Sequence, residues 1–179
     1  IATKTSAMVR ALDNPDIRLV DTRKTMPGWR ELDKYAVRCG GGHNHRMSLA
    51  GGIMLKDNHI AAAGGDIAAA VARVRKSAPH TLRVEIEVTD LDQVDAALEA
   101  GCEIIMLDNM STEQMRQATA RIRAADHPVT IEVSGNVTRE RLPELGELDV
   151  DVISSGALTH SVLAADISMK FALTQEEPA

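Results

Sequence analysis

The sequence predicts an α/β domain in which parallel strands alternate with helices, and it favours a barrel over an open doubly wound sheet. Short β-branched runs alternate with amphipathic stretches along all 179 residues, as in parallel strands joined by right-handed crossovers. No GxGxxG motif follows the first strand, which weakens the case for a dinucleotide-binding sheet. Polar residues gather at the C-terminal ends of the strands, where barrels carry their catalytic groups.

Six strands are expected, because each run is short, rich in β-branched residues and bounded by turn-forming residues. They cover 17–22, 52–57, 82–88, 103–109, 129–135 and 151–156. Alternate side chains share one face of a strand, so Glu85 and Glu87 face one way, and Glu132 and Ser134 share a face of a later strand. Both faces of most strands are largely apolar until the C-terminal end, a pattern that suits a packed barrel interior.

Helical patterns fill the intervals between the strands. They cover 1–12, 27–39, 65–78, 90–101, 111–125 and, with poorer signals, 139–148, and a final helix begins near 157. Asp90 can cap one helix and Gly101 lies just past its end, while Ser111 and Gln114 resemble a capping box.

The ends of the chain give the expected domain boundaries. The opening IATKT lacks an initiator Met and is already in a helical pattern, as if cut inside a longer protein. The polar tail 174–179 is expected to fray. We therefore expect one barrel domain over 1–173.

Composition excludes several classes of function. A net charge of -6 argues against a general nucleic-acid or membrane surface, and 2% aromatic residues leave no platform for stacking bases. No apolar run approaches the roughly 18 residues of a membrane span, and no leader marks secretion. Cys39 and Cys102 are expected to be reduced. We expect a cytoplasmic protein that binds neither nucleic acid nor membrane.

Polar residues lie at or just after the C-terminal end of every predicted strand. They are Asp21, Arg23, Lys24, Lys56, Asp57, Asn58, His59, Glu87, Asp108, Asn109, Ser134, Gly135, Asn136, Ser154, Ser155 and Gly156. In a barrel all six strand ends meet at one mouth. The loop CGGGHNHR at 39–46 would add His43, His45 and Arg46 there, because its glycines allow unusual backbone angles. This loop is a weak zinc signal, since no carboxylate lies at a suitable spacing.

Each of these residues has a simpler explanation when taken singly. Lys56 or Arg46 is more often a solvated surface charge, His45 a structural histidine, and Glu85 and Glu87 exposed strand positions. Those explanations are poor for the whole set, because the charges gather at strand exits and not on helix faces.

The cationic members of the set indicate an anionic ligand. Arginine suits planar carboxylates, and lysine acts as a point charge. The turns VSGN and SSGALTHS offer backbone N–H groups to a phosphate. Glu87 and Asp108 would then accept ribose hydroxyls or hold Mg²⁺. A sugar diol, phosphates and a multiply carboxylated molecule together indicate phosphoribosyl transfer.

The motifs DTRKTMPGWRELDKYAVRCGGGHNHR and MLKDNHI, then EIEV, IMLDN, EVSGN and SSGALTHS in order, resemble the quinolinate phosphoribosyltransferase family over essentially the whole chain. The resemblance implies an incomplete, TIM-like barrel of the type II phosphoribosyltransferases with roughly seven strands. It implies that quinolinate and phosphoribosyl pyrophosphate give nicotinate mononucleotide, pyrophosphate and CO2, with Mg²⁺, in NAD biosynthesis. It also implies a homodimer or higher homo-oligomer, and an additional N-terminal domain that covers the partner's active site and supplies an arginine.

The resemblance also implies residue roles. Arg23, His45, Arg46 and Lys56 would bind the quinolinate carboxylates. Lys24 would face pyrophosphate, while Glu87 and Asp108 would hold ribose hydroxyls and the metal. Lys24, Lys56, Glu87 and Asp108 would carry catalysis. The remaining substrate-binding residues, at the phosphate end, would be Ser134, Gly135, Asn136, Gly156 and His160.

Other interpretations stay open. One is a paralogous barrel that uses another acid, molybdenum-transport-associated or nicotinate-using, although Lys56 and the NHR triplet favour quinolinate because a second carboxylate needs a second cation. The others are a non-catalytic phosphate-binding barrel and a structural barrel with an incidental cationic mouth. The chain carries Gly51 and Gly52 in the stretch where the family usually carries an acid.

Overall fold

The computed structural model describes residues 1–171 and has six parallel strands in one sheet, in the order β1-β6-β5-β4-β3-β2. The strands are β1 (Arg18–Val20), β2 (Ile53–Leu55), β3 (Val84–Val88), β4 (Ile104–Asp108), β5 (Thr130–Ser134) and β6 (Val152–Ser154). The helices are α1 (Ala2–Leu12), α2 (Arg30–Cys39), α3 (Asp57–Ala62), α4 (Ile67–Ser77), α5 (Leu91–Glu99), α6 (Thr112–Arg123), α7 (Leu142–Leu145) and α8 (Ala157–His160).

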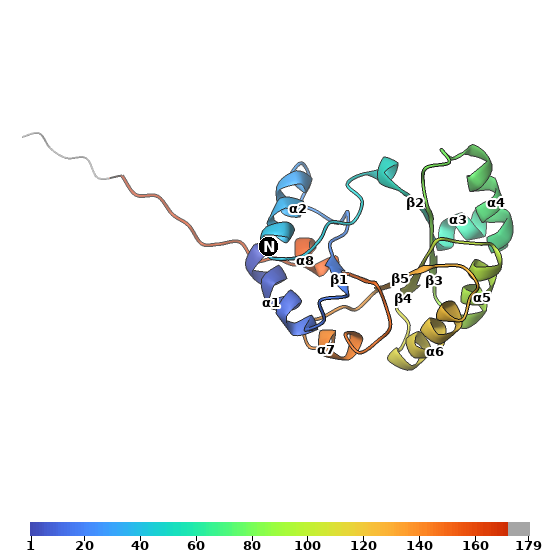
Figure 1. Cartoon of the computed structure of the whole chain (residues 1–179). Helices are drawn as coiled ribbons and strands as arrows, with labels where there is room; N and C mark the ends of the chain where they lie inside the picture. Colours follow the sequence, from blue (N-terminus) through green and yellow to red (C-terminus); the bar gives the residue numbers. More distant parts are fainter. Residues whose placement is uncertain (172–179) are drawn as a thin grey trace, which may run out of the picture.

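The sheet curls with its helices on the outside, and β1 and β2 form its two unjoined edges (Figure 1). The loop after α2 lies beside β1, where Val20 and His43 form an isolated parallel bridge. The predicted incomplete α/β barrel is therefore confirmed, with six strands among residues 1–171.

The outward face of the strands forms an aliphatic core beneath the helices. Ile86, Ile105, Leu107, Ile131 and Val133 are all fully buried. The alternate positions face the barrel interior, and this face is more polar than the sequence predicts, because Glu85 and Glu132 occupy its centre and are buried as well. The expectation that both faces are largely apolar is therefore wrong at two positions.

Local capping signals agree with the structure. The side chain of Asp90 accepts a hydrogen bond from the Gln93 N–H, and Ser111 and Gln114 form the expected capping box. Gly101 follows α5 with φ of +70°, a conformation that glycine adopts without steric cost. These signals are local, so they can be recognised without knowledge of the fold.

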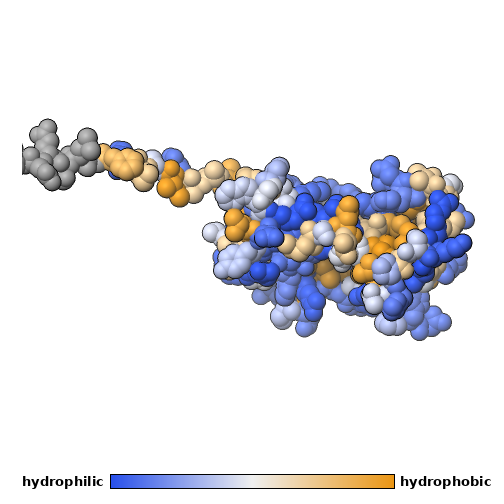
Figure 2. Space-filling view, turned by 90° about the horizontal axis from the view of Figure 1, so that it is seen from above, coloured by the Kyte–Doolittle hydropathy of each residue, from blue (hydrophilic) through white to orange (hydrophobic). Residues whose placement is uncertain are grey.

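Several predicted elements are longer than those in the structure, and two of these differences change the interpretation of the chain. The strand expected over 52–57 ends at Leu55, and α3 begins at Asp57, so Asp57 and its two successors lie on a helix. The final helix ends at His160, and 161–171 is not helical. An amphipathic helix is stabilised chiefly by packing, and here the apolar residues of the extended segment Leu163, Ile167 and Phe171 are exposed (Figure 2). The last two residues of the expected domain and the tail 174–179 lie outside the described residues.

No helix within residues 1–171 has the length and apolar character needed to cross a membrane.

Candidate active site

A cavity of about 640 Å³ opens at the C-terminal ends of the strands, and we call it the C-terminal cavity. All twelve predicted site residues line it. They are Arg23, Lys24, His45, Arg46, Lys56, Glu87, Asp108, Ser134, Gly135, Asn136, Gly156 and His160. The structure therefore brings together residues that are spread over most of the sequence.

Two guanidinium groups lie close together on one side of the C-terminal cavity. Burial and then the nearby Arg23 lower the pKa of the Arg46 guanidinium. Arg46 donates a hydrogen bond to the carbonyl oxygen of Gly52 at 2.8 Å, so the Gly51–Gly52 stretch serves as a backbone acceptor. Like charges this close repel each other, and an anionic ligand would relieve that repulsion.

Lys56 lies at the end of β2 and forms an ion pair with Glu87 at the end of β3. Both side chains line the C-terminal cavity. The backbone N–H of Lys56 is bonded to His59 Nδ1 at 3.0 Å, so His59 acts on the chain at Lys56 and does not line the cavity. Asp57 and Asn58 do not line it either, contrary to the expectation from the strand ends.

Asp21 has a structural role. It does not line the C-terminal cavity, contrary to the expectation from the strand ends. Its carboxylate is fully buried and pairs with Lys34 of α2. It also accepts hydrogen bonds from Asn44 Nδ2 at 2.6 Å and from the backbone N–H of His45 at 2.9 Å. Lys34 in turn donates to the carbonyl oxygen of His45 at 3.0 Å. This buried pair therefore fixes the loop that carries His45 and Arg46.

Arg30, the third cation of the DTRKTMPGWR stretch, connects two loops. Its guanidinium donates to the Arg23 carbonyl at 3.2 Å and to the Met47 carbonyl at 3.3 Å, and its Nε donates to the Thr25 hydroxyl at 3.2 Å. Because these loops carry Arg23 and Arg46, Arg30 holds the two cationic segments together without lining the cavity.

Two glycine turns, one after β5 and one after β6, also line the C-terminal cavity. Gly135 has φ of +84°, and a Cβ there would lie 2.8 Å from the Asn109 backbone nitrogen. A Cβ at Gly156 would lie 2.8 Å from His160 Nε2 and 3.2 Å from Lys24 Cδ. Glycine therefore lets the backbone approach these side chains closely, as a phosphate-binding turn requires.

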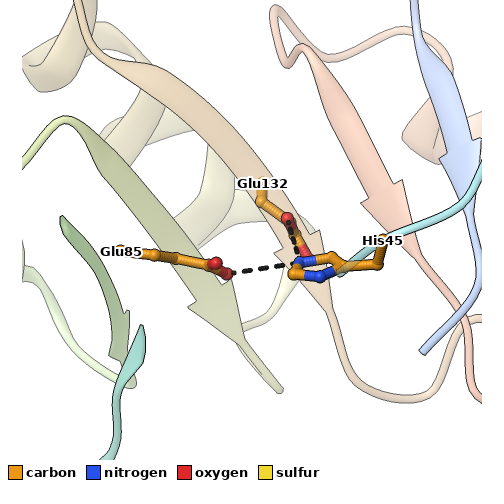
Figure 3. A group of neighbouring side chains, drawn as sticks. All are labelled: His45, Glu85 and Glu132. Carbon is orange, nitrogen blue, oxygen red and sulfur yellow. Dashed lines mark ion pairs between the residues drawn. The ribbon is translucent and has the colours of Figure 1, made fainter. Parts of the chain in front are cut away.

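His45 lies between two buried glutamates that the site prediction missed (Figure 3). Its Nε2 lies 3.6 Å from Glu85 Oε1 and 3.4 Å from Glu132 Oε2. Burial opposes the charged imidazole, but Glu132 and Glu85 outweigh it and raise the pKa of His45 to about 9. Burial raises the pKa of Glu85, and His45 counteracts part of that effect.

The sequence contains one signal for this cluster. Glu85 shares its strand face with Glu87, and Glu132 shares its face with Ser134. Glu87, Glu132 and Ser134 line the C-terminal cavity, whereas Glu85 does not. The expectation that Glu85 is an exposed strand position is wrong. The segment His43–His45 has no carboxylate nearby in sequence. In the folded chain the carboxylates of Glu85 and Glu132 lie close to His45.

Two groups of residues have the donors for a metal ion. Glu87 and Asp108 both line the C-terminal cavity, and one or two carboxylates beside a phosphate site fit Mg²⁺, which prefers oxygen ligands and keeps substrate phosphates as additional ligands. His45, Glu85 and Glu132 also place one donor atom each within 4.8 Å of one another.

These features define a parallel α/β barrel domain with an anion-binding cavity at the strand C-termini. The family described as "Quinolinate phosphoribosyl transferase, C-terminal domain" matches residues 1–170, and the chain belongs to this family.

Similar proteins carry consistent names. A "Probable nicotinate-nucleotide pyrophosphorylase [carboxylating]" of Bacillus subtilis is 46% identical over 176 residues, which cover 98% of this chain and 60% of that protein. The human "Nicotinate-nucleotide pyrophosphorylase [carboxylating]" is 40% identical, over 88% of this chain and 52% of that protein. The crystal structure of NadC from Streptococcus pyogenes has a TM-score of 0.86 and 48% identity, over 95% of this chain and 58% of that one. The chain thus spans less than two thirds of these relatives.

Proposed function

We propose that this chain contributes the catalytic barrel for phosphoribosyl transfer from phosphoribosyl pyrophosphate to quinolinate, with decarboxylation, giving nicotinate mononucleotide, pyrophosphate and CO2 in NAD biosynthesis. The observation that carries the proposal is the convergence of Arg23, Arg46, Lys56 and His45 on one side of the C-terminal cavity. Quinolinate has two adjacent carboxylates, and two guanidinium groups with an ammonium group suit them better than they suit a monocarboxylate.

Another part of the cavity would take the phosphoribosyl group. The Gly135 and Gly156 turns would receive the 5′-phosphate, with Ser134, Asn136 and His160 beside it. Glu87 and Asp108 would accept the ribose hydroxyls. Bound Mg²⁺ would stabilise the negative charge of the departing pyrophosphate.

The reaction then needs positioning and electrostatics more than a protein nucleophile. Lys24 would offset the charge that develops on the pyrophosphate, and Glu87 and Asp108 would stabilise the positive charge on the anomeric carbon. The arginines would hold the ring nitrogen in line for attack. The positive charge on the alkylated ring nitrogen draws electrons from the adjacent carboxylate as CO2 leaves.

The remaining parts of the proposal follow from the same resemblance. The working enzyme would be a cytoplasmic homodimer or higher homo-oligomer, as the family implies. It would bind only small-molecule substrates, which agrees with an acidic chain whose cations are concentrated in one cavity.

Calorimetric titration with quinolinate and, separately, with nicotinate tests the proposal. We expect preference for quinolinate, lost in Arg46→Ala and kept in Arg73→Ala, an exposed arginine of α4 that does not line the cavity. Equal affinity for both acids, in this chain and in a full-length relative with the same residues, would refute the proposed substrate.

A further inference from the structure

The His45–Glu85–Glu132 cluster is unusual because it places buried acids beneath an anion-binding cavity. The side chains of Glu85 and Glu132 are 6% and 4% exposed, and that of His45 is 16% exposed. They come from β3, β5 and the loop after α2, and the imidazole lies between the two carboxylates (Figure 3). Two acids in this position repel an anionic ligand and are costly to bury, so a favourable effect must offset them.

The hydrogen bond at the other ring nitrogen fixes the position of the imidazole proton. The backbone N–H of Arg46 donates to His45 Nδ1 at 2.8 Å, so Nδ1 supplies a lone pair. The ring that holds Arg46 is therefore the neutral tautomer with its proton on Nε2, because a charged ring carries a proton on Nδ1 as well and cannot accept there. In this tautomer the Nε2–H group faces Glu85 and Glu132.

The hydrogen bond at Nδ1 also indicates whether Nε2 carries a proton or binds a metal ion. A histidine that binds a metal through Nε2 usually donates its other ring N–H to an acceptor. Here Nδ1 faces an N–H donor, which disfavours metal binding through Nε2. Glu85 Oε1 and Glu132 Oε1 have no hydrogen-bond partner among residues 1–171, and His45 Nε2 lies 3.6 Å from Glu85 Oε1 and 3.4 Å from Glu132 Oε2.

The cluster is connected to the carboxylate-binding cations through one residue. His45 Nδ1 holds the Arg46 backbone, and the Arg46 guanidinium is held by Gly52 and contacts Met54 Sδ at 3.4 Å. Rotation of the imidazole would release the Arg46 N–H and change where the guanidinium enters the C-terminal cavity. The orientation of the ring therefore bears on the position of a cation that faces the ligand.

We propose that Glu85 and Glu132 are positioning residues for carboxylate recognition: they hold the Nε2–H of His45, and His45 in turn fixes the backbone of Arg46. The inference rests on the proposed function, because the dicarboxylate is taken to be quinolinate. It assigns a role in ligand recognition to two acids that lie outside the cationic set.

The sign of an affinity change tests this inference. Removing a negative charge beneath an anion site should tighten anion binding if charge alone matters. Loss of positioning should weaken it. We expect Glu132→Leu, which removes both charge and acceptor, to weaken quinolinate binding at least tenfold. Glu132→Gln, which keeps an acceptor oxygen, should recover part of that loss. Tighter binding in both variants would overturn the proposal.

Two further measurements keep the result interpretable. Thermal unfolding of the variants checks folding, because removing one member of a buried charge cluster can be destabilising, and affinities are compared under conditions in which each variant is fully folded. Glu144→Gln, at an exposed position of α7 that does not line the cavity, is the matched charge control and should leave quinolinate affinity unchanged.

Nitrogen NMR of His45 separates failure of this inference from failure of the proposed function. At a pH above the pKa of His45 we expect a protonated Nε2 and an unprotonated, hydrogen-bonded Nδ1 in the unliganded protein, and loss of that signature in Glu132→Leu. If quinolinate does not bind but the signature is present and sensitive to Glu132, the proposed substrate is wrong and the positioning is right. A protonated Nδ1 at that pH, or a tightly held divalent metal that Glu85→Gln releases, would overturn the positioning role itself.

Discussion

Replacing Lys34 with methionine should both destabilise the fold and weaken the ligand site. Lys34 and Asp21 are almost fully buried, with side chains 1% and 0% exposed. Removing one partner of a buried ion pair typically costs about 3–5 kcal/mol, because the other charge stays buried. Asp21 would keep its hydrogen bonds from Asn44 and the His45 N–H, so we expect the lower part of that range, about 3 kcal/mol.

The site effect has a separate origin from the loss of stability. Lys34 also donates to the His45 carbonyl, so its removal frees one anchor of the loop that carries His45 and Arg46. We expect about tenfold weaker quinolinate binding under conditions in which the variant is fully folded. Its affinity for pyrophosphate should change less, because Lys24 lies outside the loop that Lys34 anchors at the His45 carbonyl.

Urea unfolding and calorimetric titration measure the two effects. Lys76→Met, at an exposed position of α4, is the control for loss of a lysine charge and should change the free energy of unfolding by less than about 0.5 kcal/mol. The reasoning is wrong if Lys34→Met costs less than about 1 kcal/mol, or if quinolinate affinity is unchanged in the folded variant.

Three further predictions concern the same site. Gly135→Ala should cost at least about 1 kcal/mol in unfolding free energy, because it forces a positive φ and a close contact with Asn109, and phosphate affinity should fall in parallel titrations. Burial opposes the charged imidazole of His45, but Glu132 and Glu85 outweigh it and raise the pKa of His45 to about 9 from 6.5. A proton on Nδ1 breaks the hydrogen bond from the Arg46 N–H, so the ordering of Arg46 should increase as pH rises through 9, and a pH series of backbone amide exchange at Arg46 should show an increase in protection that His45→Gln lacks. Arg30→Ala should raise the KM for quinolinate in a full-length relative with little change in kcat, whereas an equal fall in kcat would contradict a purely positioning role.

The ligand-lining residues of the C-terminal cavity could be predicted because the barrel places every strand end at one mouth. Lys56, Glu87 and Asp108 follow three different strands, and no tertiary knowledge beyond parallel pairing is needed to bring them together. The supporting residues could not be predicted in this way. Asp21 meets Lys34 across 13 residues and Glu85 meets His45 across 40, and no short-range pattern encodes either pairing.

Strand parity explains why the buried acids were missed. It places Glu85 on the same face as Glu87, but it does not say whether that face is the barrel interior or the solvent side. The segment after His160 was misassigned for a related reason. Its apolar residues suggested an amphipathic helix, and the sequence alone does not show whether a surface is available for Leu163 or Phe171 to pack against.

The buried acids also explain how an acidic protein holds several cations in one cavity without a ligand. Arg23 lowers the pKa of Arg46, while Glu85 and Glu132 act on the same guanidinium in the opposite direction. The two glutamates therefore offset part of the repulsion between the arginines. A dicarboxylate bound in the cavity would offset it further. A dicarboxylate bound beside the arginines would gain favourable contacts with them, and the imidazole of His45 lies between the two acids (Figure 3). The positioning role and the charge balance thus depend on the same imidazole.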